Sequence, residues 1–245
     1  MKRFSTTLAI GAFAVLSAMA GTAAADPIAP GDSIEVQNNV GSVFTPSPTG
    51  DSNGLYTNIT IYVGSSGGQA VSAGLFVLDY RDAGVPGSAW EQFLSFCLSP
   101  DVYLQPFDNP YTAYALESSP YTTRADAISE FWARFRSSVT SDLSAAAFQV
   151  GLWELAYEGT RDASSGSFRI GSGSVLTLAN QWLAQVSADG SGPRASGLIV
   201  LVDAPGTPNR QDLLTQQVPE PGTLALLGLG LAGLAVATRR RRRDR

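Results

Sequence analysis

The chain has 245 residues, no histidine, one cysteine and 15% charged residues, with 16 basic against 21 acidic side chains. Without histidine there is no imidazole to act as a general base or a metal ligand, and one cysteine can form neither an internal disulfide nor a cysteine-rich zinc site. The composition therefore excludes His-dependent hydrolases and zinc enzymes, and with no catalytic motif present we expect a protein that is not an enzyme, without catalytic residues, metal or cofactor.

The first 25 residues have the features of a secretory signal peptide. Lys2 and Arg3 supply a positively charged start, and residues 8–20 form an apolar run that is too short to span a bilayer. Small residues follow and end at the predicted signal-peptidase cleavage site between Ala25 and Asp26; a cut directly after residue 20 is the alternative. The rest of the chain is therefore expected to be exported.

Residues 26–217 form the predicted exported domain. They contain eight arginines and 19 acidic residues, so the domain has a formal charge of −11, whereas the whole chain has −5. Since a phosphate backbone requires a basic surface, we expect no nucleic-acid partner.

The first half of this domain has a β pattern. Alternating apolar residues separated by glycine-rich turns predict strands at residues 34–36, 55–63, 75–80 and 90–98. Val43 and Phe44 are also strand-like. The segment that follows, residues 98–121, alternates proline and tyrosine and is predicted to be a long loop.

The second half is mainly helical. Apolar spacing predicts helices at about 122–137, 143–157 and 175–186, with short strands at 168–170 and 198–202. Thr122 or Thr123 is expected to cap the first helix and Asp142 the second. Gly151 lies inside the second helix, where it costs about 1 kcal/mol relative to alanine, which indicates close packing at that point. The expected fold class is α+β: a mainly antiparallel sheet or sandwich with inserted helices.

Residues 218–245 combine three elements in order. Pro219, Glu220 and Pro221 come first, then a predicted membrane helix at 223–238, then the basic cluster Arg239, Arg240, Arg241, Arg242 and Arg243. The 14 apolar residues of the helix span about 21 Å, short of the roughly 30 Å hydrocarbon core, so flanking residues must help it cross. The arginines are expected to stay in the cytoplasm and leave the preceding domain outside.

This order of elements resembles the PEP-CTERM sorting signal of Gram-negative bacteria. The resemblance implies that an exosortase, an integral membrane enzyme, recognises Pro219-Glu220-Pro221 in an inner-membrane intermediate and removes the tail. The product is then expected at the cell surface or in the extracellular matrix, with exopolysaccharide or a surface ligand as its partner. An ordinary single-pass anchor after a proline turn is the alternative.

Two segments of the exported domain carry a second resemblance. Cys97 follows an aromatic residue at the end of a predicted strand, and Gln149 and Trp153 lie one turn apart on the same face of the second helix. The segments resemble the two halves of the thioester (TQXA-type) domains of bacterial surface adhesins. The resemblance implies that Cys97 is the thiol, Gln149 the amide that it attacks, and Trp153 a shield against water. The family's Thr, Ala and Ile are replaced here by Phe148, Gly151 and Leu152.

Two functions follow, and the sequence leaves both open. The first is a structural or interaction protein at the cell surface, in which Cys97 is a small buried hydrophobe and Gln149 makes a polar contact. The second is a covalent adhesin. In that case a thiolate attacks the carboxamide, expels ammonia and leaves a thioester that a partner's amine or hydroxyl opens.

Overall fold

The strands pair into one antiparallel sheet that closes into a barrel in the computed structural model, which describes residues 28–37, 54–102, 109–203 and 210–217. The strand order is β1-β5-β7-β8-β4-β3-β2-β6, and an additional pairing of β1 with β3 closes the barrel. The bounds are β1 (Ser33–Gln37), β2 (Gly54–Val63), β3 (Gln69–Asp82), β4 (Glu91–Cys97), β5 (Asn109–Ala115), β6 (Phe168–Ile170), β7 (Leu198–Asp203) and β8 (Leu213–Gln216).

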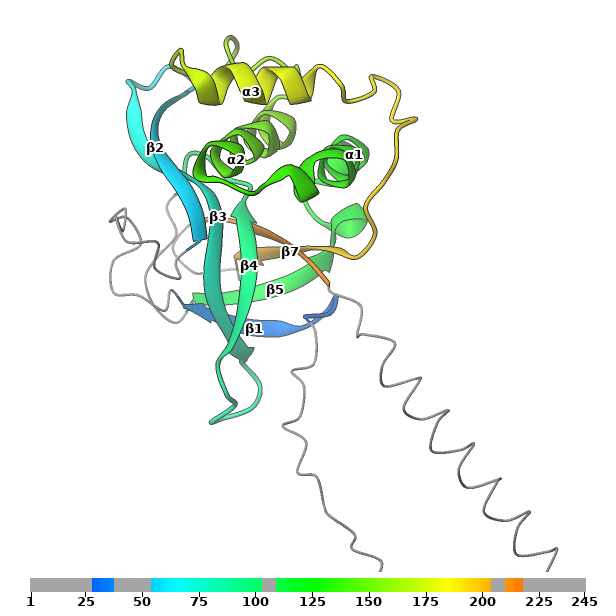
Figure 1. Cartoon of the computed structure of the whole chain (residues 1–245). Helices are drawn as coiled ribbons and strands as arrows, with labels where there is room; N and C mark the ends of the chain where they lie inside the picture. Colours follow the sequence, from blue (N-terminus) through cyan, green and yellow to red (C-terminus); the bar gives the residue numbers. More distant parts are fainter. Residues whose placement is uncertain (1–27, 38–53, 103–108, 204–209, 218–245) are drawn as a thin grey trace, which may run out of the picture.

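The 14-residue strand β3 belongs to two parts of this sheet (Figure 1). Its first half pairs with β2, and its last four residues pair with β1. The strands β2 and β3 approach closely at Gly74, where an added Cβ would lie 2.1 Å from the carbonyl oxygen of Leu55 and where φ is +157°. Only glycine allows this approach. Because the barrel closes through the pairing of β3 with β1, the strands β2 and β6 extend the sheet beyond it.

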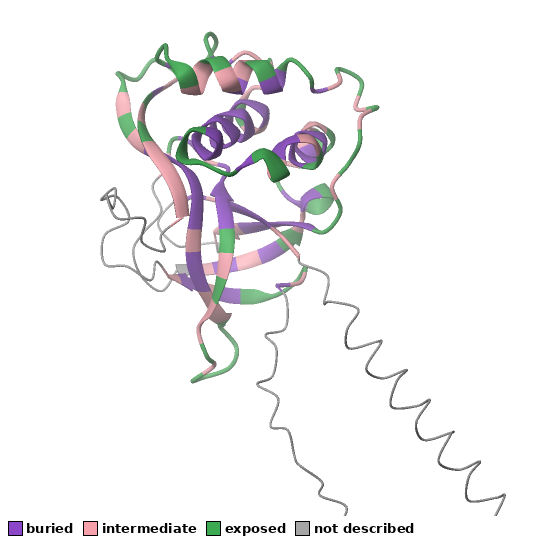
Figure 2. Cartoon of the chain, viewed as in Figure 1, coloured by how far each residue is buried: buried purple, intermediate pink, exposed green. Residues whose placement is uncertain are grey.

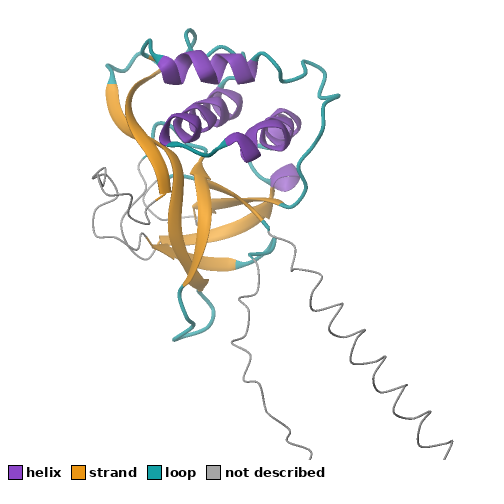
Figure 3. Cartoon of the chain, viewed as in Figure 1, coloured by secondary structure: helices purple, strands orange, loops and turns teal. Residues whose placement is uncertain are grey.

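Three helices cover one side of the barrel: α1 (Ala125–Phe135), α2 (Asp142–Tyr157) and α3 (Ser174–Leu183) (Figure 3). The helix α2 lies between the sheet and α3 and is buried continuously from residue 144 to residue 155, whereas α3 presents exposed positions to solvent (Figure 2). A helix that is apolar on all sides is stable only inside a protein. The helix α2 is therefore the central element of the domain, between the sheet and α3.

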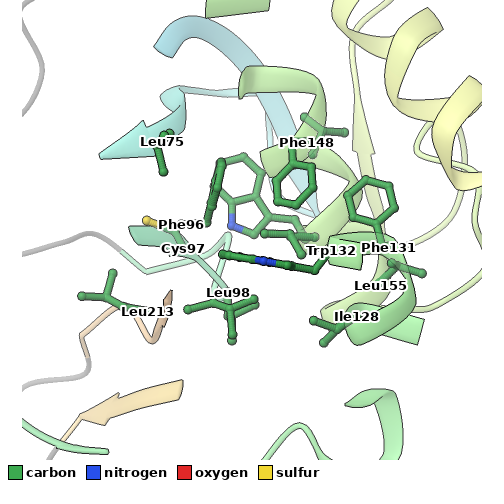
Figure 4. Close-up of a cluster of buried hydrophobic side chains, with 14 of the residues drawn as sticks. Leu75, Phe96, Cys97, Leu98, Ile128, Phe131, Trp132, Phe148, Leu155 and Leu213 are labelled. Atoms are coloured by element: carbon green, nitrogen blue, oxygen red, sulfur yellow. The ribbon is translucent and has the colours of Figure 1, made fainter. Parts of the chain in front are cut away.

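Aromatic side chains join β4 to the helices. The ring of Phe148 on α2 lies 4.7 Å from that of Phe96 on β4 and 4.9 Å from that of Phe131 on α1, measured between centroids. Trp132 packs edge-on against Phe96 at 5.8 Å (Figure 4). Such aromatic pairs contribute about 0.5 to 1.5 kcal/mol each beyond the area they bury. The cluster therefore ties α1 and α2 to the strand that ends at Cys97.

The structure confirms a mostly antiparallel β-sheet with a few helices, but several predicted details are wrong. The sheet is a barrel rather than a sandwich, since β1 pairs with β3. The predicted loop at 98–121 contains β5 and a 3-10 turn at Leu116–Ser118. Proline is tolerated near a strand end, and Tyr111 and Ala113 alternate into the core as strand residues do.

The strand β8 was also not predicted. Ser141 rather than Asp142 caps α2, through a capping box with Ser144. The helix α1 begins after a 3-10 turn at Thr122–Arg124, and neither threonine caps it.

No helix within the described ranges is long and apolar enough to cross a membrane. The predicted signal peptide, the strand-like Val43 and Phe44, and the tail with its predicted helix at 223–238 lie outside these ranges.

A buried carboxylate, Glu130, connects α1 to the segment after α3. Its Oε1 accepts hydrogen bonds from the backbone N–H of Ser187 (3.1 Å), the hydroxyl of Ser187 (2.8 Å) and Nε of Arg134 (2.7 Å). Burial alone would raise the pKa of Glu130, but these donors outweigh it and hold the pKa below its ordinary value of 4.5.

This carboxylate predicts a specific acid sensitivity. Because the folded-state pKa of Glu130 lies below the unfolded-state value, its ionised form stabilises the fold above about pH 4.5, and that contribution is lost as the pH falls through the folded-state pKa. Glu130→Gln should lower the free energy of unfolding at pH 7 by about 2 kcal/mol and flatten its decrease toward acid pH, as measured by urea unfolding. The control is Glu117→Gln at an exposed carboxylate. An unchanged acid slope in Glu130→Gln would contradict the assignment.

Candidate functional site

The backbone N–H and C=O of Cys97 point to the edge of β4 that pairs with β3 earlier in the strand but has no strand beside it at residue 97. The pairing of β3 with β4 ends at Phe76 and Ser95, two residues before Cys97. On the other side, β4 continues along β8, where Leu98 donates its N–H to the carbonyl of Asp212 at 2.8 Å. Hydrogen bonds alternate in direction along an antiparallel strand, so the N–H and C=O of Cys97 point to the vacated edge. Buried backbone groups of this kind require partners.

The side chain of Gln149 on α2 supplies both partners. The N–H of Cys97 donates to Oε1 of Gln149 at 2.9 Å, and Nε2 of Gln149 donates to the carbonyl oxygen of Cys97 at 2.6 Å. Gln149 is fully buried and Cys97 is 3% exposed. The carboxamide thus acts as a peptide group in place of the missing strand, 52 residues away in sequence. The structure thus brings together the two residues that the resemblance pairs, through the backbone of Cys97 rather than through its thiol.

The same contact orients the thiol relative to the carboxamide. A carboxamide that exchanges two hydrogen bonds with a strand lies near the plane of the sheet, whereas the side chains of the strand stand perpendicular to that plane. The sulfur of Cys97 points away from the aromatic cluster of Phe96 and Phe148 (Figure 4). From this general geometry we expect the thiol to lie to one side of the carboxamide plane.

The thiol of Cys97 lies in a buried environment. Burial raises the pKa of the Cys97 thiol far above its ordinary value, so the thiol is neutral in the folded protein. Burial also raises the pKa of Tyr111, which is close enough to Cys97 to interact with it electrostatically and donates its hydroxyl to the carbonyl of Gln211 at 2.9 Å. A reaction at Cys97 must therefore pass the thiol proton directly to a leaving group or occur before the site closes.

Trp153 is buried, at 2% exposure, on the helix turn after Gln149. Its ring packs edge-on against Phe168 of β6 at 6.1 Å, and its Nε1 has no hydrogen-bond partner among the described residues. An unpaired buried indole N–H costs free energy. Its role as a shield stays a prediction.

The sequence did not predict a polar cluster of Ser99, Tyr121 and Asp212, which begins two residues after Cys97. The hydroxyl of Tyr121 donates to Oδ2 of Asp212 at 2.8 Å and lies 3.3 Å from the hydroxyl of Ser99. Burial raises the pKa of the Asp212 carboxyl. No sequence signal marks these residues, because Asp212 reaches Ser99 only through the pairing of β8 with β4.

The remaining predicted site residues lie outside the described ranges: Ala25, Asp26, Pro219, Glu220, Pro221 and Arg239 to Arg243. Within the described ranges, no three His, Cys, Asp or Glu side chains gather as a group that would hold a metal ion.

Comparison with solved structures gives matches of low sequence identity. The chain is similar to the N-terminal thioester domain of fibronectin-binding protein SfbI from Streptococcus pyogenes, with 14% identity and a TM-score of 0.37, over 72% of this chain and 100% of that chain. It is also similar to the N-terminal domain of the S. pyogenes pilus tip adhesin Cpa, with 10% identity and a TM-score of 0.41, over 76% of this chain and 94% of that chain.

Comparison with curated proteins gives no match. Residues 217–242 match the family described as the PEP-CTERM protein-sorting motif, in agreement with the order of elements predicted for this segment. The chain therefore carries a PEP-CTERM sorting signal, which implies export that depends on an exosortase.

Proposed function

We propose that the chain is a surface protein of a Gram-negative bacterium whose exported domain forms an internal thioester between Cys97 and Gln149 and binds a partner covalently. The observation that carries this proposal is the buried pair of hydrogen bonds between the Gln149 carboxamide and the backbone of Cys97, at 2.9 and 2.6 Å. These bonds hold the carboxamide beside the residue that carries the thiol, which lowers the entropic cost of the reaction.

The chemistry balances without a cofactor. The sulfur of Cys97 bonds to the carboxamide carbon of Gln149 while the bond from that carbon to Nε2 breaks, and the thiol proton leaves with the nitrogen as ammonia. A partner's amine then attacks the thioester carbon, forms an amide with residue 149 and returns the thiol of Cys97. Each molecule reacts once, so this is a binding function rather than an enzymatic one.

The burial of Cys97 and Gln149 favours this use of the site. Both residues are buried, and exclusion of water protects a thioester from hydrolysis until a partner reaches it. The exported domain has no lysine, since Lys2 is the only one in the chain, so it offers no ε-amino group of its own that would open the bond.

A second candidate is a structural or interaction protein in which no thioester forms. The observation that favours it is that the Gln149 carboxamide already satisfies the open edge of β4, which is a complete structural role. In either case we propose that signal peptidase and exosortase process the chain in the inner membrane, and that the product resides at the cell surface or in an exopolysaccharide matrix.

The test is the intact mass of the protein exported from cells through its own signals. A thioester should reduce the mass by about 17 Da relative to the processed sequence, because ammonia has left, and treatment with methylamine should then add about 31 Da at residue 149. Neither change should occur in Cys97→Ala.

The same spectrum reports both chain ends and hence the removal of the tail. An unshifted mass, together with one thiol that reacts freely after denaturation, would exclude the thioester and leave the structural role.

A further inference from the structure

A pocket of about 450 Å³ opens between the end of α1, strand β4 and strand β8. Its volume lies within the range of small-molecule sites. Aromatic rings of Tyr80, Phe93 and Trp132 form much of its wall, and the side chains of Gln92 and Thr215 add polar groups. The pocket thus offers both ring faces and hydrogen-bonding groups to one ligand.

The wall of this pocket is held in place by hydrogen bonds. Nε1 of Trp132 donates to Oε1 of Gln216 at 2.9 Å, and Nε2 of Gln216 donates to the carbonyl of Ser196 at 2.9 Å. Nε2 of Gln217 donates to the carbonyl of Ile28 at 2.8 Å. A wall fixed in this way lowers the entropic cost of binding.

One arginine in the pocket has no counter-charge. Arg136 lies in the 3-10 turn Arg136–Ser138 directly after α1, with its guanidinium 5.8 Å from the ring centroids of Phe96 and Trp132. Among the described residues its guanidinium makes no hydrogen bond and no ion pair, although Arg134, two residues earlier, pairs with Glu130. Partial burial lowers the pKa of Arg136, as expected for a cation without an anionic partner.

The described lining of the pocket lacks negative charge, although the domain as a whole is acidic. The exported domain has 19 acidic residues against eight arginines, yet the described residues that line the pocket include Arg136 and no carboxylate. A half-buried guanidinium binds a carboxylate through two parallel hydrogen bonds, which match its planar geometry. The pocket therefore complements an anion.

We propose that this pocket binds a sugar acid, a pyranose ring that carries a carboxylate. The carboxylate pairs with Arg136, the apolar face of the ring lies against the aromatic wall, and the ring hydroxyls reach Gln92 and Thr215. A fatty acid is less suitable, since its chain requires a long apolar tunnel without amides. The site is separate from Cys97: the ring of Phe96 lies beside Arg136, while the sulfur points away from that cluster (Figure 4).

The experiment is isothermal titration of the exported protein with methyl β-D-glucuronide, methyl β-D-glucoside and acetate. The glucuronide should bind saturably at one site, and the neutral glucoside and acetate at least about tenfold more weakly. Arg136→Gln should weaken glucuronide binding by about tenfold or more.

The matched control is Arg194→Gln, which removes the same charge from an exposed ion pair with Asp126 and should bind as wild type. Leu94→Trp fills the pocket from its exposed rim and should abolish binding with Arg136 intact. Thermal unfolding reports whether each variant folds.

No binding of the glucuronide, equal binding of glucuronide and glucoside or of glucuronide and acetate, or wild-type binding by Arg136→Gln would overturn the proposal. The inference does not rest on the thioester, because Cys97→Ala should bind the glucuronide unchanged.

Discussion

In the protein whose Gln149 carboxamide is intact, replacing Gln149 with alanine should lower the free energy of unfolding of the exported domain by about 3 to 5 kcal/mol. The truncation leaves the N–H and C=O of Cys97 without partners in a buried site, and each orphaned group costs about 1 to 3 kcal/mol. It also leaves a cavity beside α2. Urea unfolding followed by circular dichroism measures this loss.

Cys97→Ala is the informative comparison for Gln149→Ala. Both variants remove any thioester, but only the loss of Gln149 leaves the backbone of residue 97 without hydrogen bonds. We expect Cys97→Ala to cost about 2 kcal/mol less than Gln149→Ala. Equal losses in the two variants would mean that Gln149 stabilises the domain through a covalent bond to Cys97 rather than by closing the edge of the strand.

Gly151→Ala should destabilise the domain by about 2 kcal/mol or more, although alanine favours a helix. An added Cβ at residue 151 would lie 2.2 Å from Cζ of Phe131, well inside contact distance. The ring of Phe131 cannot move aside freely, because Phe148 and Phe135 pack against it with centroids 4.9 and 5.3 Å away. The overpacking therefore exceeds the gain of about 1 kcal/mol in helix propensity.

A double-mutant cycle tests the cause of this destabilisation. Phe131→Leu alone opens a cavity, and in combination with Gly151→Ala it should cost less than the sum of the two single changes. The control is Gly67→Ala, where an added Cβ meets nothing within 4 Å and the stability should change little. Additive losses in the cycle would show that the clash with Phe131 is not the cause.

The elements that the sequence predicted well are those with a strong local pattern. The helices α1 and α2 and the strands β2, β3 and β4 carry enough apolar positions at a regular spacing to be recognised one by one. The close packing indicated by Gly151 is confirmed, because the cost of glycine inside a helix needs a compensating contact. Short strands such as β8 have no such signal, and they form only because the edges of β4 and β7 are available to them.

The sequence by itself determined the charge of residues 26–217 and the sorting motif at residues 217–242, and it predicts a signal peptide at residues 1–25. Such signals are linear segments, so the order of their residues is enough to identify them. The tertiary structure decided that Gln149 meets Cys97 across 52 residues, because β3 leaves the edge of β4 two residues before the cysteine. It also decided that Arg136 lies in a pocket without a counter-charge. Both are consequences of chain segments that meet only when the barrel closes, and no local pattern encodes such a meeting.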